Sequence, residues 1–317
     1  MKLIKPSYKI LNQPPGLQGI YEQIELAGRT CYASSHKIQY QENDTCNGFV
    51  STTAKDFVDR MIASQHYAML EHGTVYLKVR KGTYAYSHYV VVCEPDDDFM
   101  SSSRELSYRP YTKVNIQDDY IYVTTNYRVL VENGWLDDLK YLCEPTEYHE
   151  KRVTVRFTTS NGIMREFTRH RSHSFAVEST RYCNYNKDKF NNELTFIIPS
   201  WSKILECSVK VDSLMSVDDL KRVSKEAETN WIQSLMSAEV NYLHMIEVGY
   251  KPQEAREVLP LATKCDMVMT GFVSDWNHFF DLRTSIIAET GKPHPDASAL
   301  ADPLYKEFIN RNYLKEM

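Results

Sequence analysis

The sequence predicts an α+β fold, in which a mixed or antiparallel sheet is flanked by helices, one of them long. Residues 151–159 alternate apolar and polar side chains and give the clearest strand pattern in the chain. Residues 217–248 carry apolar side chains three or four positions apart, which is typical of an amphipathic helix. The sequence contains no Gly-x-Gly-x-x-Gly motif, so we do not expect a Rossmann fold.

The elements before residue 150 follow from the same kinds of pattern. Leu17, Ile20, Ile24 and Ala27 recur at helical spacing and predict a helix over 16–32. A strand at 2–10 is expected before that helix, and a helix at 51–64, with Ser51 or Thr52 as N-cap, after it. We then expect a strand at 74–79, an irregular loop at 94–118 and a strand at 119–124. A helix at 125–132, ended by Gly134, and a short helix at 136–142 complete this half.

The second half of the chain begins with the 151–159 strand. We expect Asn161 to cap a short helix over 162–168, which places the cations that follow near a helix C-terminus, where the dipole favours them. The later elements are a strand at 194–199, the long helix at 217–248 capped by Ser216, a short helix at 252–259, a strand at 265–270 giving way at Gly271, a helix at 275–283, and a last helix with Asp302 as N-cap and Pro303 at its first position.

The composition is that of an ordinary globular protein. Its 317 residues are 42% hydrophobic and 25% charged, and the formal net charge is −5. The acidic balance argues against general nucleic-acid binding, which needs a basic face. The seven cysteines lack metal-ligand spacing, no apolar run reaches roughly 18 residues, and the N-terminus has no signal-peptide pattern. We therefore expect a reduced, cytoplasmic protein with no membrane segment.

The stretch 169–182 is an exception to the acidic balance. It gathers arginines, histidines and serines around a short apolar run. Guanidinium groups with hydroxyls between them suit an anion, most plausibly phosphate, held in a fixed register. The alternative is a solvated basic loop without a ligand.

This stretch also resembles a family signature. Arg169-His170-Arg171, seven residues and then Ser179, with Arg181-Tyr182 after it, is similar to the signature of the flavin-dependent thymidylate synthases. The segments 27–32, 255–260 and 282–283 resemble further segments of that family. The resemblance implies reductive methylation of dUMP to dTMP with 5,10-methylenetetrahydrofolate and NADPH. It further implies FAD as the hydride carrier, a homotetramer with sites between subunits, and no enzyme nucleophile.

The resemblance also implies roles for individual residues. Arg283 would be catalytic, stabilising negative charge on the pyrimidine. The residues implied to bind dUMP are Glu166, Arg169, Ser179, Thr180, Arg181, Arg256 and Arg283. The residues implied to bind FAD are His72, Thr74, Arg169, His170, Arg171 and His278. No metal is implied.

The sequence departs from the family pattern in two places. Ala176-Val177 stand where many relatives have Asn-Glu, and Glu178 is a candidate replacement for that carboxylate. The chain 1–317 is expected to be one domain, with an insertion at about 84–150 that compact members of the family lack. Glu166 stands where relatives often carry Gln, and a carboxylate there could accept the ring N–H of a pyrimidine.

Two other functions remain open from the sequence. One is a metal-dependent hydrolase built on His66, His72, His170 and His173, although these lack the spacing of a helical zinc motif. The other is a nucleotide- or RNA-binding protein without catalysis, whose affinity would fall steeply with salt. Cys31 is interpreted as a buried structural cysteine, because no histidine is placed beside it in the sequence.

Overall fold

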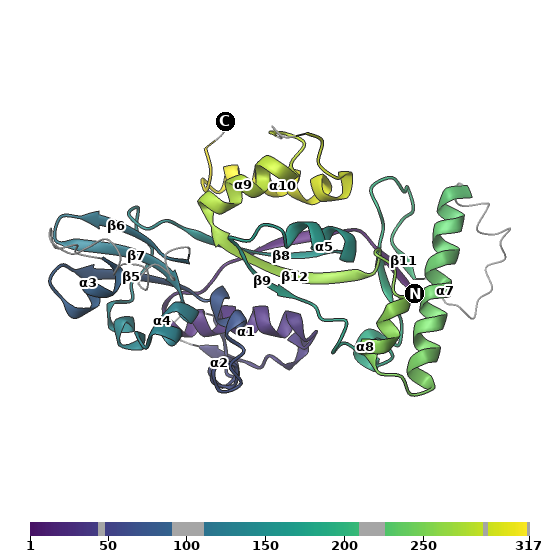
Figure 1. Cartoon of the computed structure of the whole chain (residues 1–317), viewed down its shortest axis with the longest axis horizontal. Coiled ribbons are helices and arrows are strands. Elements are labelled where there is room, and N and C mark those ends of the chain that lie inside the picture. Colours follow the sequence, from purple (N-terminus) through teal and green to yellow (C-terminus); the bar gives the residue numbers. More distant parts are fainter. Residues whose placement is uncertain (44–47, 91–110, 209–225, 288–290, 316–317) are drawn as a thin grey trace, which may run out of the picture.

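A four-stranded antiparallel sheet lies at the centre of the molecule (Figure 1). The computed structural model describes residues 1–43, 48–90, 111–208, 226–287 and 291–315. The strand order is β2 (Ser7–Leu11), β8 (Arg152–Ser160), β12 (Lys264–Phe272) and β9 (Ser174–Val177). In this register Met269 pairs with Val155 on one side and Phe175 on the other. The α+β prediction is therefore confirmed.

Helices cover both faces of this sheet (Figure 1). Met267 and Met269 face a core formed with the helices α5 (Asn161–Phe167), α9 (Val273–Arg283) and α10 (Pro295–Asn310). Val268, which points the other way, belongs to the core around α1 (Gly16–Cys31) and α2 (Ala54–Ala63). Since both faces are covered, nearly every residue of β12 is buried.

A second, three-stranded antiparallel sheet lies at one end of the molecule (Figure 1). Its order is β5 (Thr74–Arg80), β7 (Tyr120–Asn126) and β6 (Lys113–Gln117). The same region holds the 3₁₀ helices Tyr67–His72 and Leu136–Tyr141 and the helices α3 (Tyr84–Tyr89) and α4 (Tyr127–Asn133). Gly134 ends α4 with φ +71°, as predicted.

The opposite end contains α7 (Glu226–Glu247), the long helix, packed on a small sheet (Figure 1). In that sheet β1 (Lys2–Ile4) lies between β10 (Thr195–Ile197), which is parallel to it, and β11 (Cys207–Ser208). The remaining elements are the hairpin β3 (Tyr40–Asn43) and β4 (Gly48–Ser51), α8 (Pro252–Ala255), and the 3₁₀ turns Ser35–Lys37, Asp188–Phe190 and Arg256–Val258.

Several element boundaries differ from the prediction. The strand expected at 2–10 is two strands in different sheets, separated around Pro6, which has no N–H to donate to a ladder. The loop expected at 94–118 contains β6, while residues 91–110 lie outside the described residues. The strand β12 continues through Gly271 to Phe272. Ser216 and the first residues of the predicted long helix also lie outside the described residues.

The helix starts show why capping is hard to read from sequence. Ser160, and not Asn161, caps α5, because its hydroxyl accepts the N–H of Ile163 at 3.3 Å. Thr53 occupies the cap position of α2, after Ser51 has ended a strand. The last helix begins at Pro295, with Pro303 inside it and not at its start. Asp302 instead accepts hydrogen bonds from the backbone N–H and hydroxyl of Ser285.

Within the described ranges, no helix combines the length and apolar character that crossing a bilayer requires. The prediction of a cytoplasmic location stays a prediction, as does the division of the chain into one domain with an insertion at about 84–150.

Candidate active site

The helices α5 and α9 bring three predicted residues into direct contact. Arg283, at the end of α9, donates from Nη1 to Glu166 Oε2 at 2.6 Å and from Nη2 to the Glu166 carbonyl at 3.0 Å. Its Nε donates to His170 Nε2 at 3.1 Å. Three acceptors therefore fix the plane of this guanidinium before any ligand arrives.

Packing on the far side of each helix fixes these positions. Phe167 of α5 and the aromatic side chains Trp276, Phe279 and Phe280 of α9 are buried in one core. The rings of Phe167 and Phe279 meet edge to face, with centroids 5.0 Å apart. Any rotation of either helix would have to disturb this aromatic contact, so the charged side chains on the other faces are held in place.

His170 is a neutral imidazole at the centre of this group. Burial, with the nearby charges of Arg283 and His278, lowers the pKa of His170 to about 4. Because Nε2 accepts from Arg283, the proton of the neutral ring belongs on Nδ1, and that buried atom has no partner. The His278 ring, exposed on α9, lies 5.8 Å from the His170 ring.

Two further histidines, His72 and His173, are also buried. Burial, with smaller contributions from neighbouring cations, lowers the pKa of His173 and of His72 to about 3. His173 packs against Gly271, where an added Cβ would lie 2.4 Å from its ring. His72 Nδ1 is 2.8 Å from the Thr270 hydroxyl, and a hydrogen bond with the Phe175 backbone opposes the lowering of the His72 pKa.

A second predicted group lines an open cleft of about 630 Å³, which α5 also lines. The cleft is lined by Ser179, Thr180 and Arg256, together with Met164 and Arg165 of α5. Other lining residues are Cys31, Asn161, Val177, Glu178, Glu257 and Leu259. The Ser179 hydroxyl accepts the backbone N–H of Arg181 at 3.3 Å. The cleft thus joins two hydroxyls and two arginines, groups that bind anions, with the carboxylates of Glu178 and Glu257.

The remaining predicted cations point to solvent. The side chains of Arg169, Arg171 and Arg181 are exposed. Arg181 lies with Cζ 5.2 Å from the Tyr182 ring centroid. Besides these exposed arginines, the structure places predicted residues in the Arg283 group, in the cleft at Ser179, and in a separate pocket that contains Thr74.

Glu178, the candidate replacement for the missing family carboxylate, is buried and engaged. Its Oε2 accepts from Lys264 Nζ at 2.6 Å and from the Asp266 N–H at 3.2 Å, and its Oε1 accepts from the Tyr185 hydroxyl at 3.3 Å. Lys264 also donates to Asp266 at 2.7 Å. Both carboxylate oxygens of Glu178 therefore already have partners within the protein. We had not predicted this network, because its members are far apart in the sequence.

The geometry supports neither Cys31 as a nucleophile nor a metal site built on histidines. Burial and the Glu178 carboxylate raise the pKa of the Cys31 thiol, which disfavours a thiolate nucleophile. His66 Nδ1 is 3.0 Å from the Tyr32 hydroxyl. In the described part of the chain, no three His, Cys, Asp or Glu side chains are grouped so that they could hold a metal ion.

The site thus combines an oriented guanidinium, buried neutral histidines and an open cleft, which are features of ligand-binding sites in general. The sequence model of the family described as "Thymidylate synthase complementing protein" matches residues 144–310, more than half of the chain. The chain therefore belongs to this family, that of the flavin-dependent thymidylate synthases.

Individual relatives agree with this assignment. A probable flavin-dependent thymidylate synthase of Paramecium bursaria Chlorella virus 1 is 31% identical over 159 residues, which are 49% of this chain and 67% of that protein. A flavin-dependent thymidylate synthase of Haloarcula marismortui is 27% identical over 46% of this chain and 59% of its own length. For the latter, the match thus spans less than two thirds of the relative.

Solved structures are more distant. A UMP/dUMP methylase of Streptomyces cacaoi, bound with 5-Br dUMP, has a TM-score of 0.42 at 14% identity, over 98% of this chain and 93% of its own. Thymidylate synthase X of Helicobacter pylori, with FAD and dUMP, has a TM-score of 0.39 at 14% identity, over 98% of this chain and all of its own.

Proposed function

We propose that this protein is an FAD-dependent thymidylate synthase that methylates dUMP to dTMP, with 5,10-methylenetetrahydrofolate as the one-carbon donor and NADPH as the reductant. The observation that carries the proposal is the contact of Arg283 with Glu166 and His170. The family resemblance implies a ligand-binding role for each of these residues, and Arg283 is more than a hundred positions away from the other two. Membership of the family supports the same activity.

The Arg283 group suits the edge of a uracil ring. A guanidinium donates to a carbonyl oxygen, whereas a carboxylate accepts a ring N–H, so Arg283 and Glu166 together complement both kinds of group. Because Arg283 is already oriented, it can stabilise negative charge on the pyrimidine with little reorganisation. In this proposal the phosphate of dUMP is bound by Ser179, Thr180, Arg181, Arg256 and Arg169.

Residues around His170 fit a bound flavin. His170 Nδ1 is buried and has no partner among the described residues, as expected of a donor whose acceptor belongs to a ligand. Arg169, Arg171 and His278 are exposed beside it, and His72 and Thr74 complete the proposed FAD set. When bound, FAD supplies the hydride that the transferred carbon requires.

The reaction would need no nucleophile from the protein. The Ser179 hydroxyl accepts a backbone hydrogen bond and no histidine contacts it among the described residues. The raised pKa of Cys31 likewise disfavours attack by its thiol. The protein groups would bind, orient and stabilise charge.

We also propose a homotetramer that acts in the cytoplasm. The predicted nucleotide residues lie in separate places on one chain, so subunits that share sites would bring them together. The five cysteines in the described residues are all free, as expected of a reducing compartment. Light scattering on the flavin-loaded protein tests the assembly, and a monomer that retains FAD contradicts it.

The decisive experiment follows dTMP formation from dUMP, 5,10-methylenetetrahydrofolate and NADPH, with FAD occupancy read from the visible spectrum. We expect a yellow protein, bleached by dithionite, whose spectrum changes on addition of dUMP. A protein that takes up no FAD at micromolar concentration, or one that holds FAD but forms no dTMP, contradicts the proposal.

A further inference from the structure

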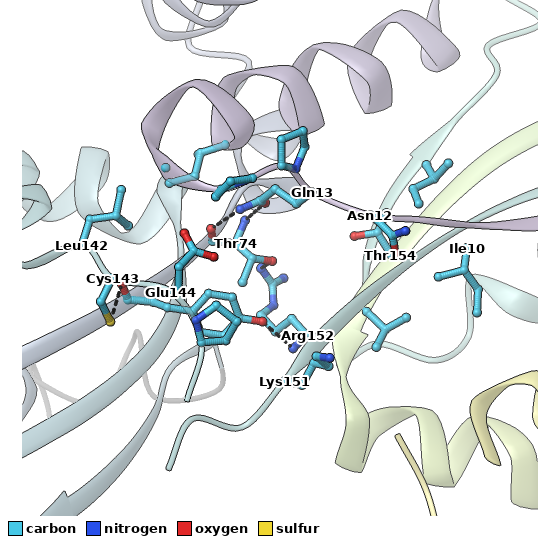
Figure 2. A pocket seen from close by; sticks show the side chains of 18 of the residues that line it. Ile10, Asn12, Gln13, Thr74, Leu142, Cys143, Glu144, Lys151, Arg152 and Thr154 are labelled. Carbon is cyan, nitrogen blue, oxygen red and sulfur yellow. Dashed lines mark hydrogen bonds between the residues drawn. The ribbon is translucent and has the colours of Figure 1, made fainter. Parts of the chain in front are cut away.

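A separate pocket of about 200 Å³ lies between the start of α1, the start of β8 and the segment 142–145. Figure 2 shows Gln13, Thr74, Glu144 and Arg152 around this space, beneath the purple helix α1. Arg283 is hydrogen-bonded to Glu166 and His170 and to none of these four residues, and Ser179, Thr180 and Arg256 line a different cleft.

Arg152 is the unusual member of this pocket. It is only 9% exposed, yet no carboxylate in the described residues forms an ion pair with it. Its Nη1 donates to the Thr74 hydroxyl at 3.3 Å, its Nη2 donates to the Glu71 carbonyl at 3.1 Å, and its Nε has no partner. A buried charge without a counter-ion is costly to hold, because water no longer solvates it.

The surrounding negative charges do not offset the effect of burial on the pKa of Arg152. Burial lowers the pKa of Arg152 to about 10, although Tyr76, Glu71 and Asp275 act in the opposite direction. The Glu71 carboxylate is itself paired with Arg128 at 2.6 Å. Arg152 does rest on the Phe272 ring, with Cζ 5.5 Å from the centroid. The buried Nε of Arg152 has no hydrogen-bond partner among the described residues.

The first turn of α1 adds a second source of positive potential. The cap residue Pro15 offers no side-chain acceptor, and no acidic residue lies in the first turn of this 16-residue helix. Pro14, Pro15 and Gly16 line the pocket, so the uncapped N-terminus opens onto it. Gln13 is held beside it by two hydrogen bonds of 2.8 Å to the backbone of Thr74.

We propose that this pocket binds an oxyanion, the phosphoryl or carboxylate group of a ligand, between the Arg152 guanidinium, Lys151 and the first turn of α1. The volume admits a group of that size and excludes a whole dinucleotide. Thr74 belongs both to the proposed FAD set and to this pocket. Among the described residues, Glu144, which is exposed, is the one carboxylate that lines the pocket. The site does not require the proposed thymidylate synthase activity.

Cys143 gives a local readout, because it lines the pocket and its thiol is free. The experiment alkylates the purified full-length protein and follows Cys143 and the exposed Cys207 separately by peptide mass spectrometry. Inorganic pyrophosphate and glutarate serve as the two probes. We expect at least one to slow alkylation of Cys143 and leave Cys207 unchanged. Protection by pyrophosphate alone identifies a phosphoryl ligand, and protection by glutarate alone identifies a carboxylate ligand.

Variants separate this site from general anion binding. Arg152→Met is expected to weaken protection about tenfold or more, as the loss of a charge-assisted hydrogen bond does. Arg156→Met, on the same strand, removes an arginine that is already paired with Asp266 and should leave protection intact. Two variants at exposed positions keep the test valid if Arg152→Met does not fold: Lys151→Met should weaken protection about two- to fivefold, and Glu144→Gln should strengthen it.

The proposal is overturned if neither anion protects Cys143, or if Cys207 is slowed equally. It is also overturned if protection is undiminished in both Arg152→Met and Lys151→Met. Because none of these measurements uses dUMP or FAD, their outcome is independent of the test of thymidylate synthase activity.

Discussion

Two charged groups on the β12–α9 unit differ in how completely their members are paired. At the start of β12, Lys264 and Asp266 form a closed network with Glu178 and Arg156, and each charge has a partner of opposite sign. At the end of α9, Arg283 is paired, but His170 Nδ1 beside it is not. The first arrangement stabilises the fold, whereas the second leaves polar atoms available to a ligand. Both groups therefore pair their charges, and they differ in the neutral histidine beside Arg283, whose Nδ1 has no partner within the protein.

The strongest test of the structural network is Lys264→Met. It leaves the buried carboxylates of Glu178 and Asp266 without their shared cation, and such a loss costs about 3–5 kcal/mol of unfolding free energy. Urea denaturation measures this. The control is Lys55→Met, which removes the exposed pair with Asp59 and should change nothing measurable. Equal effects of the two variants would show that the network does not stabilise the fold.

Arg283→Ala tests the functional group. We expect it to retain FAD and the oligomer but to lose about 10²–10³ in kcat, because the interaction strengthens as charge develops on the pyrimidine. Arg256→Ala, in the open cleft, should mainly raise the KM for dUMP. Steady-state kinetics with flavin occupancy checked give both values, and an unchanged kcat in Arg283→Ala refutes the assigned role.

Lowering the pH should reduce the free energy of unfolding through the buried histidines of the candidate site. The folded pKa values of His72, His170 and His173, about 3 to 4, lie below the ordinary 6.5, so the unfolded chain binds protons that the folded chain does not. Stability is therefore fully present above pH 6.5 and falls toward pH 4, by up to about 1.4 kcal/mol per pH unit for each group.

The slope of stability against pH is measured by urea titrations between pH 7.5 and 5. His173→Leu removes one of these groups and should reduce the slope by up to one proton, whatever its effect on stability at pH 7.5. A slope that does not change would mean that His173 is protonated in the folded protein.

Ser179→Ala should have the smallest effect. It removes the hydroxyl that accepts the Arg181 N–H, a net contribution of about 0.5–1.5 kcal/mol, and should weaken dUMP binding without abolishing turnover. Binding titration and kinetics test this. Isolation of a covalent adduct between Ser179 and the nucleotide would contradict a mechanism without an enzyme nucleophile.

Sequence patterns predicted the parts of the fold that depend on local chemistry. Alternation located β8, helical spacing located α1, and the wider family resemblance named Glu166, His170 and Arg283, which are in contact in the structure. The pairing of charged side chains was not predictable from the sequence. Whether Glu178 meets Lys264, and whether Arg152 meets a carboxylate, depends on strands that come together only in the folded sheet. The predicted helix caps were wrong for a related reason. When the preceding strand is one residue longer or shorter than expected, the first residue of the helix and its cap shift by one position.

The position of β12 between β8 and β9 has a consequence for how the protein is made. Neither β8 nor β9 can complete its hydrogen bonding until residues 264–272 have left the ribosome, whereas β5 and β7 meet much earlier in synthesis. A chain halted before residue 264 would therefore carry exposed strand edges, which chaperones and proteases recognise and which promote aggregation. The last third of translation thus sets the time at which Arg283 first reaches its partners.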